Sequence, residues 1–105
     1  MSVKISRADG DSLRVIAAIE GEIDHHSAKA LREEIDRHAE RIKPTVLTLD
    51  MSGVSFMDSS GIGLIMGRYK LMSELGGTIE VTGASQGIAR MIKLAGLSRL
   101  GISVS

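Results

Sequence analysis

Residues 45–67 read TVLTLDMSGVSFMDSSGIGLIMG and join two patterns of different period. The first residues, Thr45–Leu49, are mostly apolar or β-branched, which is typical of a strand buried in the middle of a sheet. From Ile62 onward, the apolar residues show the three- and four-residue spacing of a helix. Between them we expect a loop over residues 50–58, and Asp58 at its end is a typical helix N-cap. A strand that passes into a helix in this way predicts an α/β fold, since parallel strands need helical crossovers.

The residues before this stretch predict a hairpin and a first helix. Apolar residues alternate with polar or small ones over residues 3–5 and 13–19, and turn residues lie between them at Ala8–Ser12. From Ala28 to Ile42 the apolar residues recur three or four apart, with charged residues on the other face. This helix is expected to have a cap and a stop. The capping residue is Asp24 or Ser27, and the terminating residue is Pro44.

The residues after this stretch continue the alternation of helices and strands. Gly76-Gly77 ends the second helix, and Thr78–Thr82 is another short strand. Residues 88–95 form a third helical stripe, and residues 100–104 indicate a last strand. The predicted order is therefore β-β-α-β-α-β-α-β, a mixed sheet with helices packed on it in a single domain over residues 1–105.

Composition and charge exclude several classes of protein. The 105 residues are a usual length for one domain, and 43% are hydrophobic but only 2% aromatic. Thirteen basic residues balance thirteen acidic ones, which argues against nucleic acid as the main partner. The sequence has no cysteine, no signal-like apolar start and no run of the ~20 apolar residues that a membrane span needs. We therefore expect a cytoplasmic protein without a membrane partner or a direct nucleic-acid partner.

No combination of residues predicts catalysis, a metal site or a cofactor. The glycines that follow Ser60 have neither the dinucleotide fingerprint nor the spacing of a phosphate-binding loop. His25 and His26 are adjacent, and His38 lies far off in the sequence, so a metal site is not expected. Ser59 lacks the Gly-x-Ser-x-Gly elbow of serine hydrolases. As residues of the expected helix, these glycines instead predict close packing of its backbone. They are Gly61, Gly63 and Gly67.

The run Asp58-Ser59-Ser60-Gly61 lies where the strand is expected to pass into the helix. Carboxylate and hydroxyl groups are common at such a point because they accept hydrogen bonds from the unpaired N–H groups of a helix start. A helix start also favours an anion, and a loop tip is accessible to another enzyme. From these residues alone, plain capping and a phosphorylation site both remain open.

The run from Val54 to Gly63, VSFMDSSGIG, continues to Gly67-Arg68-Tyr69-Lys70 and closely resembles the signature of bacterial anti-sigma factor antagonists in the STAS domain family. Upstream, the segment from Gly21 to His26 resembles the one that leads into the first helix of that family. The resemblance covers nearly the whole chain and includes the expected order of elements. Family members commonly continue into a further helix after the last strand, so we expect one sheet edge and one helical face to be less covered here.

The resemblance implies a partner-switching regulator that is not an enzyme. In this family the unphosphorylated antagonist binds an anti-sigma factor that is also a serine kinase, and so frees the sigma factor. Phosphorylation of the serine directly after the aspartate, here Ser59, inactivates the antagonist until a phosphatase restores it. By the same resemblance, the residues implied in partner binding are Asp24, Asp58, Ser59, Gly61, Gly63 and Arg68.

Two other functions remain open at this stage. A scaffolding STAS subunit of a larger stress-signalling assembly would use the same serine to tune packing. A small-molecule or nucleotide binder would use the glycine-rich helix start. The resemblance does not identify the sigma factor, although the histidine pair and the run Arg68-Tyr69-Lys70 favour sporulation over general stress as the output.

Overall fold

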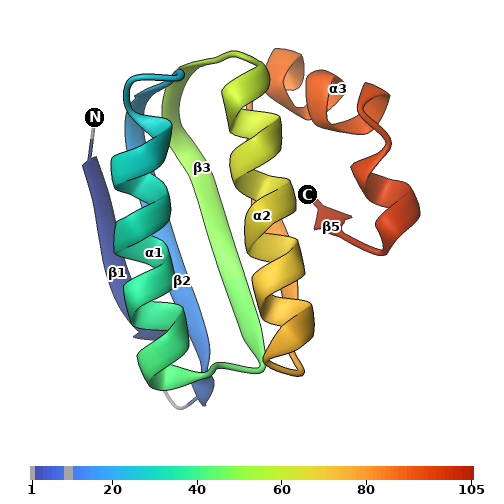
Figure 1. Cartoon of the computed structure of the whole chain (residues 1–105). Helices are drawn as coiled ribbons and strands as arrows, with labels where there is room; N and C mark the ends of the chain where they lie inside the picture. Colours follow the sequence, from blue (N-terminus) through green and yellow to red (C-terminus); the bar gives the residue numbers. More distant parts are fainter. Residues whose placement is uncertain (1, 9–10) are drawn as a thin grey trace.

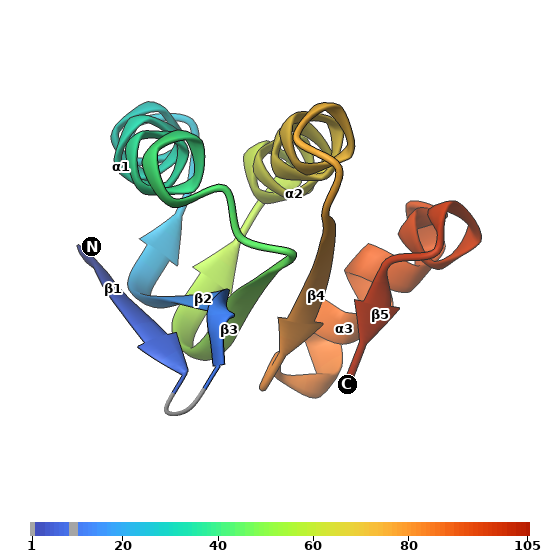
Figure 2. The ribbon, with the colours of Figure 1, turned by 90° about the horizontal axis from the view of Figure 1, so that it is seen from below.

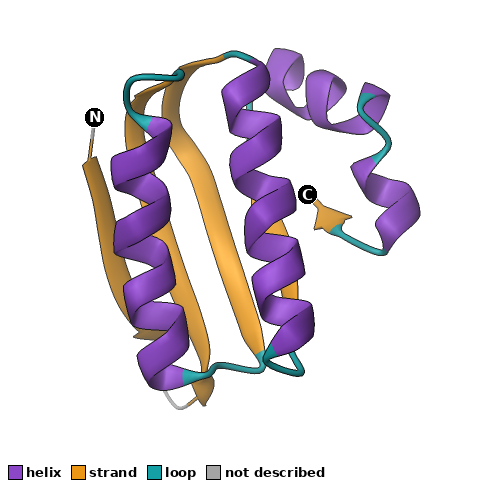
Figure 3. Cartoon of the chain, in the orientation of Figure 1, coloured by secondary structure: helices purple, strands orange, loops and turns teal. Residues whose placement is uncertain are grey.

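The computed structural model describes residues 2–8 and 11–105. Within them, five strands form a mixed sheet with three α-helices and one short 3-10 helix, so the predicted α/β class and element order are confirmed (Figure 1). Figure 3 shows how helices and strands alternate after the first two strands. The elements in chain order are β1 (Ser2–Ala8), β2 (Asp11–Ile23), α1 (Ala28–Ile42), β3 (Val46–Met57), α2 (Ser59–Glu74), β4 (Thr78–Thr82), α3 (Gln86–Leu94), the 3-10 helix (Leu97–Leu100) and β5 (Ser103–Val104).

The strands lie in the sheet in the same order as in the chain, β1-β2-β3-β4-β5. β1 runs antiparallel to β2, and the other neighbouring pairs are parallel. Figure 2 shows α1 and α2 side by side over one face of the sheet, whereas α3 lies by β4 and β5. Because β2 and β3 point the same way, the two helices that follow them start at the same end of the sheet. This end therefore collects two strand ends and two helix starts.

The core lies between the sheet and its helices. Side chains alternate across a strand, so every second residue of the central strands points into the core. Each helix contributes one buried stripe, as the spacing of its apolar residues predicts. All members of the core are aliphatic or methionine. On the strands they include Val15, Ala17, Ile19, Leu47, Leu49, Met51, Ile79 and Val81, and on the helices Leu31, Ile35, Ala39, Leu64, Ile65, Met72, Ile88 and Ile92.

The opposite face of the sheet carries a polar ladder across three strands. Thr48 lies between the core residues of β3 and therefore points away from the helices. Its hydroxyl donates to Glu80 Oε1 at 2.7 Å and accepts from Arg14 Nη1 at 3.0 Å. Arg14 also forms an ion pair with Glu80. This ladder joins β2, β3 and β4 side by side on the face that α1 and α2 leave uncovered.

Residues 50–58 are not the loop that we expected from the sequence, because β3 runs on to Met57. The pairing of β3 with β2 shifts register at two points near Gly21, whose φ is 97°. Gly53 pairs with Glu20, the residue before Gly21, and an ideal Cβ on Gly53 would be 2.8 Å from Glu20 Cγ. These irregularities break the alternation of buried and exposed residues that identifies a strand in a sequence. Pairing nevertheless continues to the ends of both strands.

The last predicted strand is also shorter than expected. Leu100 ends the 3-10 helix, and only Ser103–Val104 pairs with β4. Gly96 and Gly101 flank the 3-10 helix with φ of 83° and 84°, a conformation that glycine adopts without strain. The centre of the predicted hairpin turn, residues 9 and 10, lies outside the described residues. Among the helices that the structure describes, none is both long and apolar enough to cross a membrane.

Candidate functional site

The candidate site lies at the end of the sheet where β2 and β3 finish. Ile23 and Met57 are paired across the two strands, and Asp58 N–H donates to the Ile23 carbonyl at 3.1 Å. The chain then turns from β2 into α1 through Asp24 and from β3 into α2 through Asp58. The pairing of the strand ends therefore brings Asp24 and Ser59 to the same end of the sheet, although they are far apart in the sequence. Figure 1 shows α1 and α2 both starting at this end.

Asp58 caps α2, as the sequence predicts. Its backbone is extended, with φ of −103° and ψ of −168°, and its Oδ1 accepts the N–H of Ser60 at 2.8 Å. The N–H of Gly61 donates to the carbonyl of Asp58 at 2.9 Å. These bonds satisfy donors that a helix start would otherwise leave unpaired. These hydrogen bonds therefore stabilise the first turn of α2.

Ser59 is the first residue of α2, and its side chain is exposed. Its hydroxyl makes no hydrogen bond with any other residue in ranges 2–8 and 11–105. Ser60, by contrast, is only partly exposed and lines a groove between α1 and α2. Of the two adjacent serines, Ser59 therefore offers the more accessible hydroxyl.

The turn before α1 is organised by Asp24. Its Oδ1 accepts the N–H groups of His26 at 2.9 Å and Ser27 at 3.0 Å. The bond from the Ser27 N–H, followed by that from His26, holds the pKa of the Asp24 carboxyl below its ordinary value despite some desolvation. Of the two residues expected to cap α1, Ser27 occupies the N-cap position. Its side chain makes no capping hydrogen bond, however, because its hydroxyl instead donates to the Glu22 carbonyl at 3.0 Å.

The three glycines of α2 play different parts. An ideal Cβ on Gly61 would lie 2.1 Å from Met57 Cγ, so any other residue there would force the Met57 side chain or the start of α2 to shift. At Gly63 and Gly67 nothing lies within 4 Å of the corresponding point. The prediction that these glycines allow close packing therefore holds for Gly61 and is wrong for the other two, which leave open space on the helix surface.

Arg68 and Asp36 join α2 to α1 below this surface. Arg68 Nε lies 2.6 Å from Asp36 Oδ1, and the two side chains are 6% and 24% exposed. Arg68 Nη1 also donates to the Leu64 carbonyl at 3.2 Å. Burial raises the pKa of the Asp36 carboxyl, and the charge of Arg68 opposes that shift. Burial likewise lowers the pKa of the Arg68 guanidinium, opposed by the charge of Asp36. The pair links the two helices through side chains that are largely removed from solvent.

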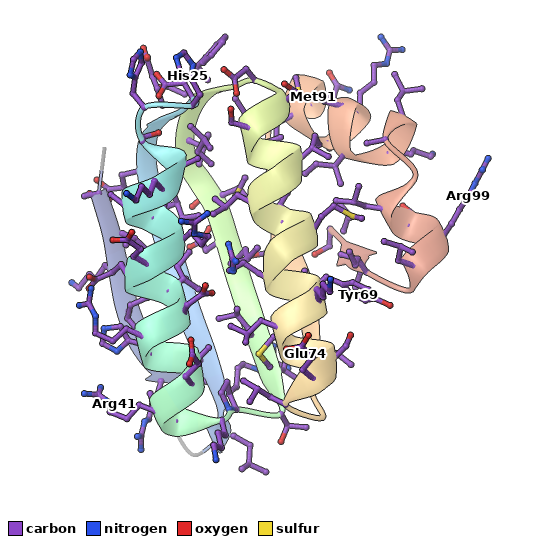
Figure 4. The ribbon with its side chains drawn as sticks, viewed as in Figure 1. His25, Arg41, Tyr69, Glu74, Met91 and Arg99 are labelled. Atoms are coloured by element: carbon purple, nitrogen blue, oxygen red, sulfur yellow. The ribbon has the colours of Figure 1, made fainter. Side chains whose placement is uncertain are left out.

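A groove of about 460 Å³ runs between α1 and α2. Figure 4 shows His25, one of its lining residues, at the top of the view before the start of α1. On the α1 side the groove is bordered by two cationic side chains, and on the α2 side by two glycines and a serine together with Leu64 and the ion-paired Arg68. Its lining residues are His25, Ala28, Lys29, Arg32, Ser60, Gly63, Leu64, Gly67 and Arg68. Sequence reasoning missed this groove, because its two walls are about one helix and one strand apart in the chain.

Phe56 was also not singled out from the sequence as a surface residue. It is 50% exposed near the end of β3, two residues before Asp58. A large exposed apolar side chain is informative when it lies beside other candidate binding residues. The available signal was its position in the quoted run, as the only phenylalanine of the chain.

The predicted site residues fall into two layers. Asp24, Asp58, Ser59 and Gly63 reach the surface at the end of the sheet, whereas Gly61 and Arg68 are buried beneath it. The histidines do not gather with other ligands, and no group of three or more His, Cys, Asp or Glu side chains in the described part of the chain could hold a metal ion. The exposed layer offers hydroxyl, carboxylate and apolar groups for contact with another molecule.

The sequence matches the STAS domain family over residues 3–103. It is 34% identical over 86 residues to the anti-sigma F factor antagonist of Paenibacillus polymyxa, covering 82% of this chain and 74% of that protein. It is 35% identical over 79 residues to the anti-sigma-B factor antagonist of Bacillus subtilis, covering 75% and 71%. The structure resembles the crystal structure of an anti-sigma factor antagonist from Mycobacterium paratuberculosis with a TM-score of 0.84 and 25% identity, over 98% of this chain and 83% of that one. This chain is therefore a member of the STAS domain family.

Proposed function

We propose that this chain is an anti-sigma factor antagonist that is switched by phosphorylation of Ser59. In the unphosphorylated state it binds an anti-sigma factor with serine kinase activity and thereby releases a sigma factor in the cytoplasm. The relatives named as antagonists, at 34% and 35% identity, support the general function. The exposed hydroxyl of Ser59, free of hydrogen bonds within the described chain, carries the proposal that this residue is the switch.

The chemistry of the switch needs no catalytic group in this chain. The kinase transfers the γ-phosphoryl group of ATP to Ser59 Oγ, the hydroxyl proton is lost, and ADP leaves. A phosphatase later hydrolyses the ester and restores the hydroxyl. Ser60 is a poorer acceptor, because it is only partly exposed and lines the groove.

Magnitudes indicate that phosphate acts on binding rather than on the fold. An anion at a helix start gains roughly 0.3 to 2 kcal/mol from the helix dipole, and the nearby carboxylate of Asp58 opposes this gain. At an interface the same group adds about 1.5 to 2 negative charges, and burying them without a matched cation costs several kcal/mol. Each 1.4 kcal/mol is about a factor of ten, so we expect affinity for the kinase to fall roughly a hundredfold or more.

The two layers of the site suggest two roles for the remaining residues. Asp24, Asp58 and Gly63 are surface groups that a partner can contact together with Ser59. Phe56 extends this surface with an apolar side chain of the kind that carries binding energy in interfaces. The buried residues Gly61 and Arg68 act through the placement of α2 rather than through contact with the partner.

The test compares Ser59→Ala, Ser59→Asp and Ser60→Ala for binding to the cognate kinase with and without ATP. Ser59→Ala should bind and resist release by ATP, whereas Ser59→Asp should lose most binding while it keeps the melting temperature of the parent. Ser60→Ala is the control and should still be phosphorylated and released. Phosphate found on Ser60, or an early-melting Ser59→Asp variant, would contradict the proposed switch. A particle of many copies in gel filtration would instead favour a scaffolding subunit.

A further inference from the structure

The groove between α1 and α2 has the charge of an anion site. His25, Lys29 and Arg32 border it from α1 and the turn before it, and none of the described residues that line it carries a carboxylate. The whole chain has equal numbers of acidic and basic residues, so this absence is local. A cavity walled by one sign of charge concentrates ions of the opposite sign.

In the described part of the chain, Lys29 and Arg32 make no direct contact with a carboxylate, although the charge of Arg32 acts on Asp36 one turn further along α1. Within residues 2–8 and 11–105, neither Lys29 nor Arg32 forms an ion pair or a side-chain hydrogen bond. The lining residue Arg68 differs, because Asp36 neutralises it. Lys29 and Arg32 lie three residues apart in α1, so their side chains project from neighbouring positions on one face. Two unpaired cations at such spacing can reach one ligand together.

The α2 wall of the groove leaves room for a ligand. Gly63 and Gly67 lie one turn apart, and nothing is within 4 Å of the place where a Cβ would stand on either. The hydroxyl of Ser60 at the upper end makes no hydrogen bond within the described chain and can donate to an anion. The volume of about 460 Å³ is ample for a tetrahedral oxyanion and a small organic group attached to it.

The groove also lies beside the candidate phosphorylation site, because Ser60 and Gly63 line it. Gly63 lies four residues after Ser59, so the two positions are neighbours on the surface of α2. Because Gly63 has no side chain, nothing at that position separates Ser59 from the groove. A phosphate monoester carries three acceptor oxygens and close to two charges, which suits a lysine, an arginine and a hydroxyl.

We propose that this groove is an oxyanion site for phosphate monoesters, with Lys29 and Arg32 as its charged ligands and Ser60 as a neutral donor. The phosphoryl group has two candidate sources, namely phosphorylated Ser59 of the same chain and a free phosphorylated small molecule. The first source rests on the proposed function, whereas the second does not. In either case Lys29 and Arg32 bind the phosphate, and the absence of a side chain at Gly63 leaves the groove accessible.

The first experiment titrates the unphosphorylated full chain with inorganic phosphate at constant ionic strength and follows backbone amides by ¹⁵N NMR. Saturable shifts are expected at Lys29, Ser60 and Gly63. Lys29→Gln and Arg32→Gln should each weaken binding about tenfold, which is the usual effect of losing one charge-assisted hydrogen bond. Arg90→Gln is the matched control, because Arg90 lines a separate basic surface on α3 with Lys93, and it should leave the affinity unchanged.

The outcome does not depend on the kinase. Shifts that fail to saturate, or that are the same in Lys29→Gln and Arg32→Gln as in the parent, would overturn the oxyanion site. If the kinase still binds in that case, the proposed switch stands without it. The second experiment repeats the titration on protein with phosphoserine genetically encoded at position 59. Loss of phosphate binding would identify the Ser59 ester as the occupant, and unchanged binding would identify a free ligand.

Discussion

The surface of α2 and the layer directly below it differ in what they do, although they are built from the same few turns. Ser59 and Gly63 are exposed and touch little of the rest of the chain. Gly61 and Arg68 are buried, the first against Met57 and the second against Asp36. One helix thus carries binding groups on one side and positioning groups on the other. Substitutions in the two layers should therefore separate partner affinity from stability.

The largest effect is expected from the buried ion pair. Arg68→Met leaves Asp36 without its partner at 24% exposure, and we expect it to lower the free energy of unfolding by about 3 kcal/mol. The measurement is urea denaturation at pH 7. Arg37→Met breaks an exposed pair with Glu34 and should cost no more than about 0.5 kcal/mol. Equal losses in the two variants would show that the buried pair does not hold the lower layer together.

The next largest effect concerns binding alone. Phe56→Ala should weaken kinase binding by about ten- to thirtyfold, because exposed aromatic side chains that become buried in an interface contribute about 1.5 to 2 kcal/mol. Its melting temperature should change little, since the ring is already half exposed. Leu94→Ala, on α3 at 81% exposure, is the matched control and should leave affinity unchanged. Isothermal titration calorimetry measures the kinase affinity of both variants. Similar losses of affinity in both would show that Phe56 does not contact the partner.

Two glycines, one from each layer, give the sharpest contrast. Gly61→Ala should destabilise the fold by about 1 to 2 kcal/mol because its Cβ collides with Met57. Gly63→Ala should stabilise the fold by up to about 1 kcal/mol through helix propensity, since its Cβ meets nothing within 4 Å, and yet should weaken binding. Thermal melting and kinase affinity measured together on both variants test this. A Gly63→Ala variant with full affinity would mean that the partner does not approach this turn.

The smallest effect is the pH dependence of the Asp24 turn. The folded-state pKa of Asp24 is lowered from its ordinary value of 3.8, so its carboxylate stabilises the fold above that value and ceases to do so as the pH falls through the lowered pKa. The difference in urea midpoint between the parent and Asp24→Asn should therefore be constant near neutral pH and shrink in acid. Glu74→Gln, on the exposed end of α2, controls for the general loss of a carboxylate. If the difference in urea midpoint widened in acid, the pKa of Asp24 would not be lowered in the folded state.

Features set by neighbouring residues were predictable from the sequence, and features set by distant residues were not. The Asp58 cap was predictable because it depends on a side chain and an N–H two residues apart. The extension of β3 was missed because register shifts opposite Gly21 disrupt the alternation. The pairing of Arg68 with Asp36 joins two helices whose order in space no local pattern reveals. The groove was missed for the same reason, since its cations and its glycines come from different helices.

The sheet order has a consequence for how the chain can fold as it is synthesised. Because the order β1-β2-β3-β4-β5 repeats the order of the sequence, each strand joins the free edge that the preceding strand leaves. No strand has to insert between two that are already paired, and each closure spans at most one α-helix, joined before β5 by the short 3-10 helix. The loop-closure entropy of every step is therefore modest, which favours rapid folding and allows structure to grow from the first residues onward. The end of the sheet at Ile23 and Met57, where the candidate binding residues lie, is formed once α2 has been synthesised. It does not require β4.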